Sequence, residues 1–377
     1  MKFIDVIGQS AVKQHLTGLV SRNRLSHALL FTGKEGTGPL ALALAFAQYV
    51  LCEQKGVDAC GNCNACKKSG SFIHPDIHFS YPVITRKPGD KPVSTDFIKE
   101  WREFISGFPY GTVYDWLQFI GAENKQGNIS ALECNDIIRK LHLKSFESGY
   151  KVLVMWLPEY LGKEGNILLK LIEEPPSDTL FILVTENETL VLPTLISRTQ
   201  LVRVPPIATT DIEQALKNKG NINPEQARQI ASVSGGNYRE SMQLIQHAGE
   251  DWQALLRDWL NAIMKTGPVA QVKWIEEISK QGRENQKQFL RYFNHLLEQA
   301  IRIQVMPGHE LSIPDNEQDF AIRLNKMAGI NQQRAIIEEL DKASFYIERN
   351  ANAKMLFHAL TIKLYHIIAD KSLILTF

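Results

Sequence analysis

The chain has 377 residues, of which 44% are hydrophobic and 22% are charged, and its formal net charge at pH 7 is +1. These proportions are typical of folded globular proteins and exclude extended disorder, and the length suffices for two or three domains. The nearly neutral total excludes a global attraction to nucleic acid, so any contact with DNA must come from a local patch or from a partner.

The apolar runs along the chain are short. The most apolar of them, residues 41–52, is well below the roughly 18 residues that a membrane-spanning helix needs. Residues 1–8 lack the apolar core of a secretory signal. We therefore expect a cytoplasmic protein with no part embedded in a membrane.

The first predicted unit is a buried strand, a glycine-rich turn and a helix. Residues 28–33 form a short apolar run that ends at a glycine, which is typical of a buried parallel strand. Glycines recur up to residue 38, and residues 40–51 have the alanine and leucine content of a buried helix. A strand, a glycine turn and a helix in this order open a parallel α/β sheet.

Helices and strands continue in the segment up to residue 206. The predicted helices are residues 96–120 with a break at 107–110, residues 129–143 opening after Ser130, and residues 166–174 before two prolines. The predicted strands are residues 151–157, 180–185 and 202–206. This order of elements extends the α/β domain.

Aromatic side chains are concentrated in residues 101–119. Such a segment can form a stacking surface for nucleic acid or can pack against its own apolar face. Because the segment contains few basic residues, packing within the protein is the favoured interpretation.

Beyond residue 206 the pattern is helical. Short helices are predicted between residues 210 and 247, with a helix start at Asn223 and a turn at 234–236. Residues 251–377 have helical period almost throughout. A stripe at helical spacing predicts a buried core first and a partner surface second; it consists of Trp274, Phe289, Tyr292, Phe293 and Leu297.

Residues 33–38, called the glycine loop below, have the frame of a phosphate-binding loop, G-x-x-x-x-G-K-[ST]. The loop keeps its glycines at Gly33, Gly36 and Gly38. Pro39 takes the position of the phosphate-binding lysine, and Leu40 takes that of the Mg²⁺-binding hydroxyl. Proline brings neither charge nor a backbone donor, and leucine brings no oxygen ligand. The loop is either a glycine turn that never bound nucleotide or a phosphate loop that has lost its function, and the surrounding motifs favour the second.

Four of the five cysteines lie between residues 52 and 66: Cys52, Cys60, Cys63 and Cys66. Thiolates two residues apart in a turn can converge on a tetrahedral Zn²⁺ ion, and four of them complete its coordination. Disulfides are the alternative, which a reducing compartment disfavours. We predict a structural zinc site with no open catalytic position at this cysteine cluster. Cys134 stands alone and is predicted to be a buried, neutral thiol.

Several segments in order resemble the bacterial clamp-loader AAA+ family. Residues 5–9 are similar to the adenine-side box of that family, and residues 24–31 precede the glycine loop as they do there. Residues 166–176, which end in Glu-Glu-Pro-Pro, are similar to its strongest signature, and residues 192–199 resemble its Ser-Arg-Cys motif. The resemblance extends to about residue 245. Each motif is weak by itself, and the occurrence of all of them in the family's order makes the resemblance specific.

The departures from the family pattern concern catalysis. The family's acidic pair should end the strand at 151–157, but the corresponding residues are Trp156 and Leu157, and Glu159 lies beyond a proline. Without the lysine, the hydroxyl and the acidic pair, phosphoryl transfer has almost no electrostatic catalyst. This pattern is typical of the delta-prime branch of the family rather than of the catalytic tau/gamma branch.

Two arginines acquire roles through the resemblance. Arg198 corresponds to an arginine that, in clamp loaders, reaches the ATP of the neighbouring subunit as a finger supplied in trans. Thr199 replaces the cysteine of that motif and leaves the arginine intact. Arg239, after two glycines, resembles the family's second sensor arginine; with no ATP bound beside it, a structural role is equally compatible.

The resemblance implies the fold class and the domains. The fold class is α/β: an AAA+ P-loop-type parallel-sheet domain with a zinc-binding insertion, a small helical lid domain and a C-terminal all-α collar domain. The expected bounds are residues 1–206 for the AAA+ domain with its zinc module at 52–66, 207–248 for the lid, and 249–377 for the collar, which oligomerises.

The resemblance also implies a function and partners. A delta-prime-type (stator) subunit needs no ATP of its own, assembles with tau/gamma and delta subunits, and helps to load the sliding clamp of DNA polymerase III. It meets the clamp and the primer-template DNA through the assembly. One alternative is an active tau/gamma-type ATPase with an unorthodox phosphate loop, which Pro39 and Leu40 disfavour. Another is a zinc-bearing interaction protein outside replication, which the ordered motifs disfavour.

Overall fold

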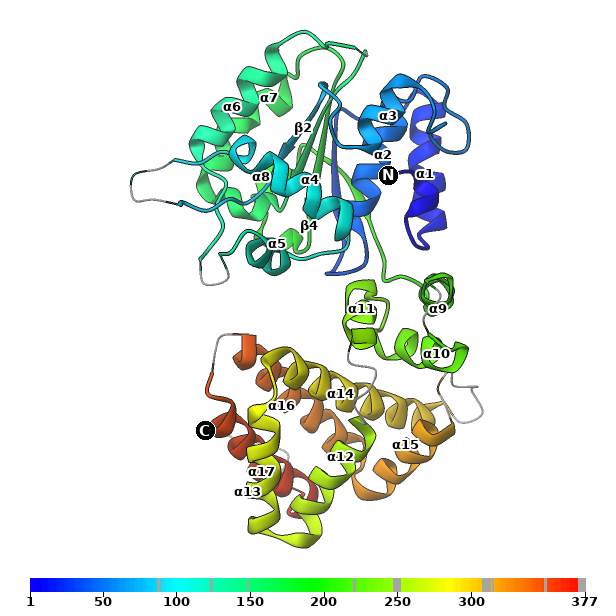
Figure 1. The fold of residues 1–377 in the computed structure, drawn as a ribbon, viewed down its shortest axis with the longest axis vertical. Coiled ribbons are helices and arrows are strands. Elements are labelled where there is room, and N and C mark those ends of the chain that lie inside the picture. Colours follow the sequence, from blue (N-terminus) through cyan, green and yellow to red (C-terminus); the bar gives the residue numbers. More distant parts are fainter. Residues whose placement is uncertain are drawn as a thin grey trace. The chain divides into compact units, whose positions relative to one another are not determined.

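Figure 1 shows a computed structural model of the chain. It describes residues 1–86, 89, 91–122, 125–147, 149–219, 222–246, 252–306, 313, 315–348 and 351–371. The chain forms two compact units, Met1–Ala215 with Gly235–Glu240 and Leu216–Ser234 with Ser241–Phe377. The predicted boundary between a lid and a collar at residues 248 and 249 lies outside the described residues.

The first unit contains a five-stranded sheet with the order β2-β3-β4-β1-β5. The strands are β1 (Ala28–Thr32), β2 (Ile77–Ser80), β3 (Lys151–Trp156), β4 (Thr179–Thr185) and β5 (Gln200–Arg203). Every pairing between them is parallel, with Leu30 opposite Leu183 across β1 and β4 and Val154 opposite Ile182 across β3 and β4. The predicted α/β class with a P-loop-type parallel sheet is confirmed.

Helices cover both faces of this sheet (Figure 1). The helix α2 (Pro39–Leu51) packs on β1, β3 and β4 and is buried along its whole length. On the other face, α6 (Ala131–His142) and α7 (Leu169–Glu173) share a core with alternate residues of β1, β3 and β4. Because both faces are covered, the central strands are apolar at successive positions instead of alternating.

Several sequence predictions need correction. The strand β2 and the helices α1 (Ser10–Ser21) and α3 (Asn64–Gly70) were not predicted. The last strand lies at Gln200–Arg203, not 202–206, because pairing with β1 fixes its position and the prolines follow it. The helix expected at 166–174 begins as the 3-10 segment η3 (Pro158–Leu168) and becomes α-helical only in α7.

The aromatic segment packs within the first unit. It consists of η2 (Ser94–Phe97), α4 (Ile98–Gly107) and α5 (Val113–Phe119), with the predicted break between the two helices. Trp101, Phe104 and Trp116 are fully buried. Trp101 stacks on Tyr81 with ring centroids 4.0 Å apart. The favoured interpretation, packing on its own apolar face, agrees with this burial.

The second unit is helical. Its elements are α10 (Pro224–Val233), α12 (Trp252–Asn261), the π-helical η5 (Ala262–Thr266), α13 (Pro268–Lys280), α14 (Arg283–Val305), α15 (Asp315–Met327), α16 (Ile330–Glu348) and α17 (Ala353–Ala369). Two further helices, α9 (Thr209–Asn218) and α11 (Tyr238–Gln246), contain residues of both units. The predicted stripe from Trp274 to Leu297 is buried, and Trp259 stacks on Trp274 at 4.6 Å. Over the described part of the chain, no helix is both long enough and apolar enough to cross a membrane.

Candidate functional site

The glycine loop joins β1 to α2 with the backbone that its glycines allow. Gly36 and Gly38 have φ angles of +67° and +91°, a region that residues with a side chain rarely adopt. The amide of Gly33 donates to Thr185 O at 3.2 Å, which fixes the loop to β4. Pro39 begins α2 and is buried with Leu40. The predicted frame therefore exists as a folded loop without the lysine and the hydroxyl.

Side chains of the same unit cover the glycine loop. A Cβ at Gly38 would lie 2.6 Å from the ring of Tyr110, and a Cβ at Gly36 would collide with the side chain of Asn237. The hydroxyl of Tyr110 accepts a hydrogen bond from Ile7 N at 2.8 Å. The amide of Tyr238 donates to Gly36 O at 3.0 Å, and its ring lies 5.0 Å from that of Tyr110. Side chains of the first unit therefore pack closely on two glycines of the loop.

Arg239 is engaged by a carboxylate of the first unit. Its Nη2 donates to Asp115 Oδ1 at 2.6 Å, and its Nε donates to the other oxygen of Asp115. The two side chains are only 11% and 22% exposed. Thr112 N also donates to Asp115 at 2.8 Å, so this carboxylate caps α5 while it binds the arginine. Burial alone would raise the pKa of Asp115, but the hydrogen bonds and charge of Arg239 outweigh it and lower the pKa.

We expect Asp115→Asn to lower the free energy of unfolding of the first unit by about 2 kcal/mol at pH 7, since hydrogen bonds between charged partners contribute about 1.5–3 kcal/mol. Folding lowers the pKa of Asp115, so the ion pair stabilises the fold above the ordinary pKa of an aspartate and is lost as the pH falls through the lower folded value. The difference in the free energy of unfolding between the unaltered chain and Asp115→Asn should therefore shrink below about pH 4. Urea denaturation at pH 7 and at pH 3.5 measures this difference.

The exposed Glu103 on α4 gives the control, Glu103→Gln. Equal stability of both variants at pH 7 would contradict the expected role of Asp115.

The end of β3 carries aromatic and apolar residues where the acidic pair would lie. Trp156 and Leu157 are each 1% exposed, and the ring of Trp156 lies 5.3 Å from that of Trp101. Glu159 stands beyond them, accepts a hydrogen bond from Glu186 N at 3.3 Å, and has a pKa that burial raises. The end of β3 therefore presents a packed indole and a buried leucine instead of a carboxylate.

A cavity of about 500 Å³ remains beside the glycine loop. Lys34, Glu35 and Glu186 line it. The pKa of Glu186 lies well above its ordinary value, because burial and then the charges of Glu35 and Glu159 disfavour another negative charge there. Lys34 brings one positive charge to the lining, whereas a triphosphate carries up to four negative charges, so the lining compensates little of the charge of a nucleotide.

Arg198 lies just after α8 (Pro193–Ile196), and its side chain is 33% exposed. Its Nε donates to Glu173 Oε1 at 2.6 Å, and its Nη1 donates to Thr194 O at 2.9 Å. Glu173 ends α7 and is the first acid of the Glu-Glu-Pro-Pro sequence. Two segments of the family resemblance therefore meet in one ion pair at the surface of the first unit.

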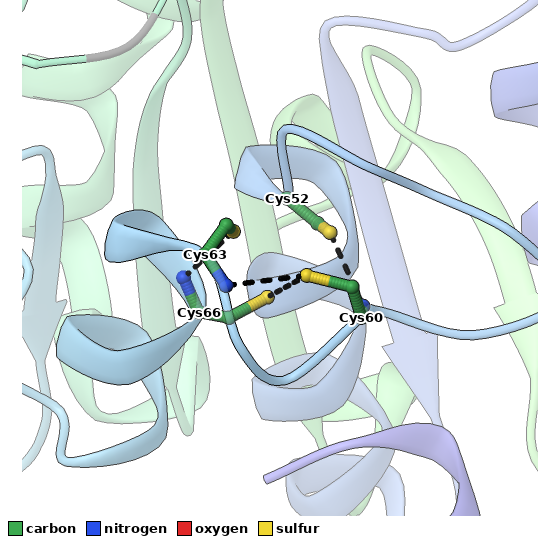
Figure 2. A group of neighbouring side chains, drawn as sticks. All are labelled: Cys52, Cys60, Cys63 and Cys66. Carbon is green, nitrogen blue, oxygen red and sulfur yellow. Dashed lines mark hydrogen bonds between the residues drawn. The ribbon is translucent and has the colours of Figure 1, made fainter.

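The four cysteines predicted to bind zinc converge (Figure 2). Their sulfur atoms all lie within 4.8 Å of one another, and Sγ of Cys60 lies 3.8 Å from Sγ of Cys66. Cys52 follows α2, and Cys63 caps α3 by accepting from Cys66 N at 3.4 Å. Gly61, with φ of +78°, makes the turn between Cys60 and Cys63. All five cysteines of the chain are free thiols, so the disulfide alternative is not realised.

The cluster suits a tetrahedral ion bound by sulfur. Zinc–sulfur bonds of about 2.3 Å in a tetrahedron place the sulfurs about 3.8 Å apart, as between Cys60 and Cys66. Backbone N–H groups of Cys63 and Asn62 lower the pKa of Cys60 to about 6, whereas burial raises that of Cys66 to about 12. A cation would stabilise all four thiolates at once. Its effect would be structural, because four protein ligands leave no open position.

Other predicted residues lie apart from these sites. Cys134 is buried in the core, and burial raises the pKa of its thiol to about 12, in agreement with a neutral cysteine. Tyr110, Asp115 and Asn237 were not predicted as site residues. The spacing of Thr112 and Asp115 fits a capping box and could have located a helix start. Nothing in the local sequence indicates their partners, since Asp115 and Arg239 are 124 residues apart.

Known proteins similar to this chain point to one family. The model of the family described as DNA polymerase III, delta subunit matches residues 8–208. The DNA polymerase III subunit delta' of Bacillus subtilis (strain 168) is 29% identical over 236 residues, which are 63% of this chain and 59% of that protein. The DNA polymerase III subunit tau of the same organism is 27% identical over 312 residues, which are 79% of this chain and 46% of that protein. A solved structure of a DNA polymerase III gamma subunit-related protein from Thermotoga maritima aligns over 93% of this chain and 98% of that one, with 14% identity and a TM-score of 0.37.

The chain spans about three fifths of the delta' relative and about half of the tau relative. The family match covers more than half of the chain and includes the glycine loop, the cysteine cluster, the five strands and Arg198. The chain therefore belongs to the DNA polymerase III delta subunit family.

Proposed function

We propose that the chain is a delta-prime-type (stator) subunit of the DNA polymerase III clamp loader. In this role it assembles with tau/gamma and delta subunits, hydrolyses no ATP in its own glycine loop, and donates Arg198 to ATP held by a neighbour. Through the assembly it takes part in loading the sliding clamp onto primer-template DNA. The relatives named delta' and tau support the choice of complex.

The observation that carries the proposal is the covered glycine loop. The loop has lost its lysine and its hydroxyl, Tyr110 and Asn237 pack on its glycines, and Arg239 is bound by Asp115. Phosphoryl transfer needs cations and oriented donors at the phosphate groups. In the adjoining cavity, Lys34 compensates only part of the charge that a triphosphate would bring.

The location of Arg198 supports its proposed role in trans. Its side chain is partly exposed on the surface of the first unit, outside the cavity beside the glycine loop. A guanidinium at a surface can reach nucleotide on another subunit, where it would neutralise charge on the transferring phosphoryl group.

The proposed subunit has three domains and one structural metal ion. We propose an AAA+ domain at residues 1–206, a lid at 207–248 and an oligomerising collar at 249–377. The proposed metal ion at Cys52, Cys60, Cys63 and Cys66 is structural Zn²⁺, consistent with four converging thiols.

The isolated chain should show no ATP turnover and no tight ATP binding, as measured by phosphate release and by calorimetry. The double variant Pro39→Lys with Leu40→Thr, which restores the loop consensus, should remain inactive, because the end of β3 still lacks carboxylates and Tyr110 still lies on Gly38. An authentic tau/gamma subunit serves as the positive control. Robust turnover by the unaltered chain would favour the alternative, an active tau/gamma-type ATPase.

A further inference from the structure

Arg198 is held by its own chain at all three guanidinium nitrogens. Nε donates to Glu173 Oε1 at 2.6 Å, and Nη2 forms an ion pair with the same oxygen. Nη1 donates to Thr194 O at 2.9 Å and to Ser197 Oγ at 3.2 Å. The guanidinium plane is therefore fixed from two sides, by the carboxylate that ends α7 and by the turn that carries the arginine.

Stability is a poor explanation for this contact. The side chains of Arg198 and Glu173 are 33% and 46% exposed. Exposed ion pairs contribute little to folding, because water already solvates both charges and the ordering of two long side chains costs entropy. An arginine that must meet a phosphate group gains from being ordered beforehand, because less rotamer freedom is then lost on binding.

We propose that Glu173 is a positioning residue for Arg198. Its carboxylate holds the guanidinium in the orientation from which it reaches nucleotide on the neighbouring subunit. A guanidinium has five N–H donors, and the contacts with Glu173, Thr194 and Ser197 occupy four of them. One donor on Nη2 remains for a phosphate oxygen while Glu173 stays bound. This inference rests on the proposed function of Arg198.

The chain offers a matched control in the next residue. Glu174 is also exposed and lies in the same Glu-Glu-Pro-Pro sequence, so Glu174→Gln makes the same change of charge one position away. The test uses the full chain reconstituted with tau/gamma and delta subunits, and it compares kcat and KM for ATP hydrolysis. Gel filtration verifies that each variant assembles.

Glu173→Gln should lower kcat on the order of tenfold and leave KM for ATP unchanged, because a misplaced group affects the transition state more than binding. Glu174→Gln should leave both values unchanged. In the Arg198→Ala background, Glu173→Gln should have no further effect, since its role passes through that arginine.

The outcomes separate the inference from the proposed function. If Arg198→Ala lowers turnover but Glu173→Gln does not, the proposed positioning role of Glu173 is wrong and the proposed role of Arg198 in trans is unaffected. If the two glutamine variants lose equal activity, or if Glu173→Gln slows the Arg198→Ala assembly further, the effect of Glu173 is structural and the inference is overturned. If Arg198→Ala leaves turnover unchanged, the proposed finger fails and the inference fails with it.

Discussion

Arg198→Ala should slow ATP hydrolysis at the neighbouring site of the reconstituted assembly by about 10³-fold, the lower end of what an arginine finger contributes. The guanidinium would compensate charge that develops on the phosphoryl group only as the reaction proceeds, so its loss should reduce the rate and leave assembly intact. Single-turnover hydrolysis, with the assembly in excess over ATP, measures this rate without a contribution from product release.

Arg203→Ala is the matched control for that experiment. Arg203 ends β5, is 75% exposed and lies 3.8 Å from Glu188, so its removal deletes the same charge five residues away. The control assembly should turn over ATP normally. A rate within twofold of the unaltered assembly for Arg198→Ala would show that the neighbouring ATP does not depend on this arginine.

Loss of the proposed zinc ion is expected to destabilise the first unit by about 4 kcal/mol when free zinc exceeds the dissociation constant by about 1,000-fold. The segment that bears the cysteines also binds the segment before α1. Phe3 N and Ile4 N donate to the carboxylate of Asp58 at 3.1 and 2.9 Å. Release of the ion should therefore loosen residues 1–5 together with residues 52–66.

Cys63→Ser and a strong chelator provide two independent tests of this loss. Elemental analysis should find one zinc ion per unaltered chain and substantially less in Cys63→Ser, and hydrogen exchange should accelerate in residues 1–5. Cys134→Ser should keep the full zinc content, since Cys134 lies in a different core and contacts Glu164 O at 3.7 Å. Full zinc content and unchanged stability in Cys63→Ser would refute the site.

The sequence predicted the strands in the middle of the sheet, missed the edge strand β2 and misplaced the bounds of the edge strand β5. The strands β1, β3 and β4 are buried on both faces, so their apolar runs are continuous and recognisable. The edge strand β2 has only four residues, and two of them, His78 and Ser80, are polar. The other edge strand, β5, is fixed by hydrogen bonds to β1 rather than by its own composition. Burial leaves a local signal, whereas pairing at an edge does not.

Some site residues have a local sequence signal, and others are recognisable only from their contacts in the folded chain. Pro39 and Leu40 could be assigned as losses because a phosphate loop has a fixed local spacing. The cysteine cluster was predictable because its four ligands lie close together in the chain. Tyr110 and Asp115 could not be predicted in this way, because their contacts form only on folding. Tyr110 packs on Gly38, and Asp115 binds Arg239. A pattern within one segment cannot specify such pairs.

The ion pair between Asp115 and Arg239 also bears on how anions in solution compete for this arginine. Because the carboxylate belongs to the same chain as the guanidinium, its local concentration does not depend on the concentration of free anions. A free anion must displace this tethered partner before it can bind Arg239.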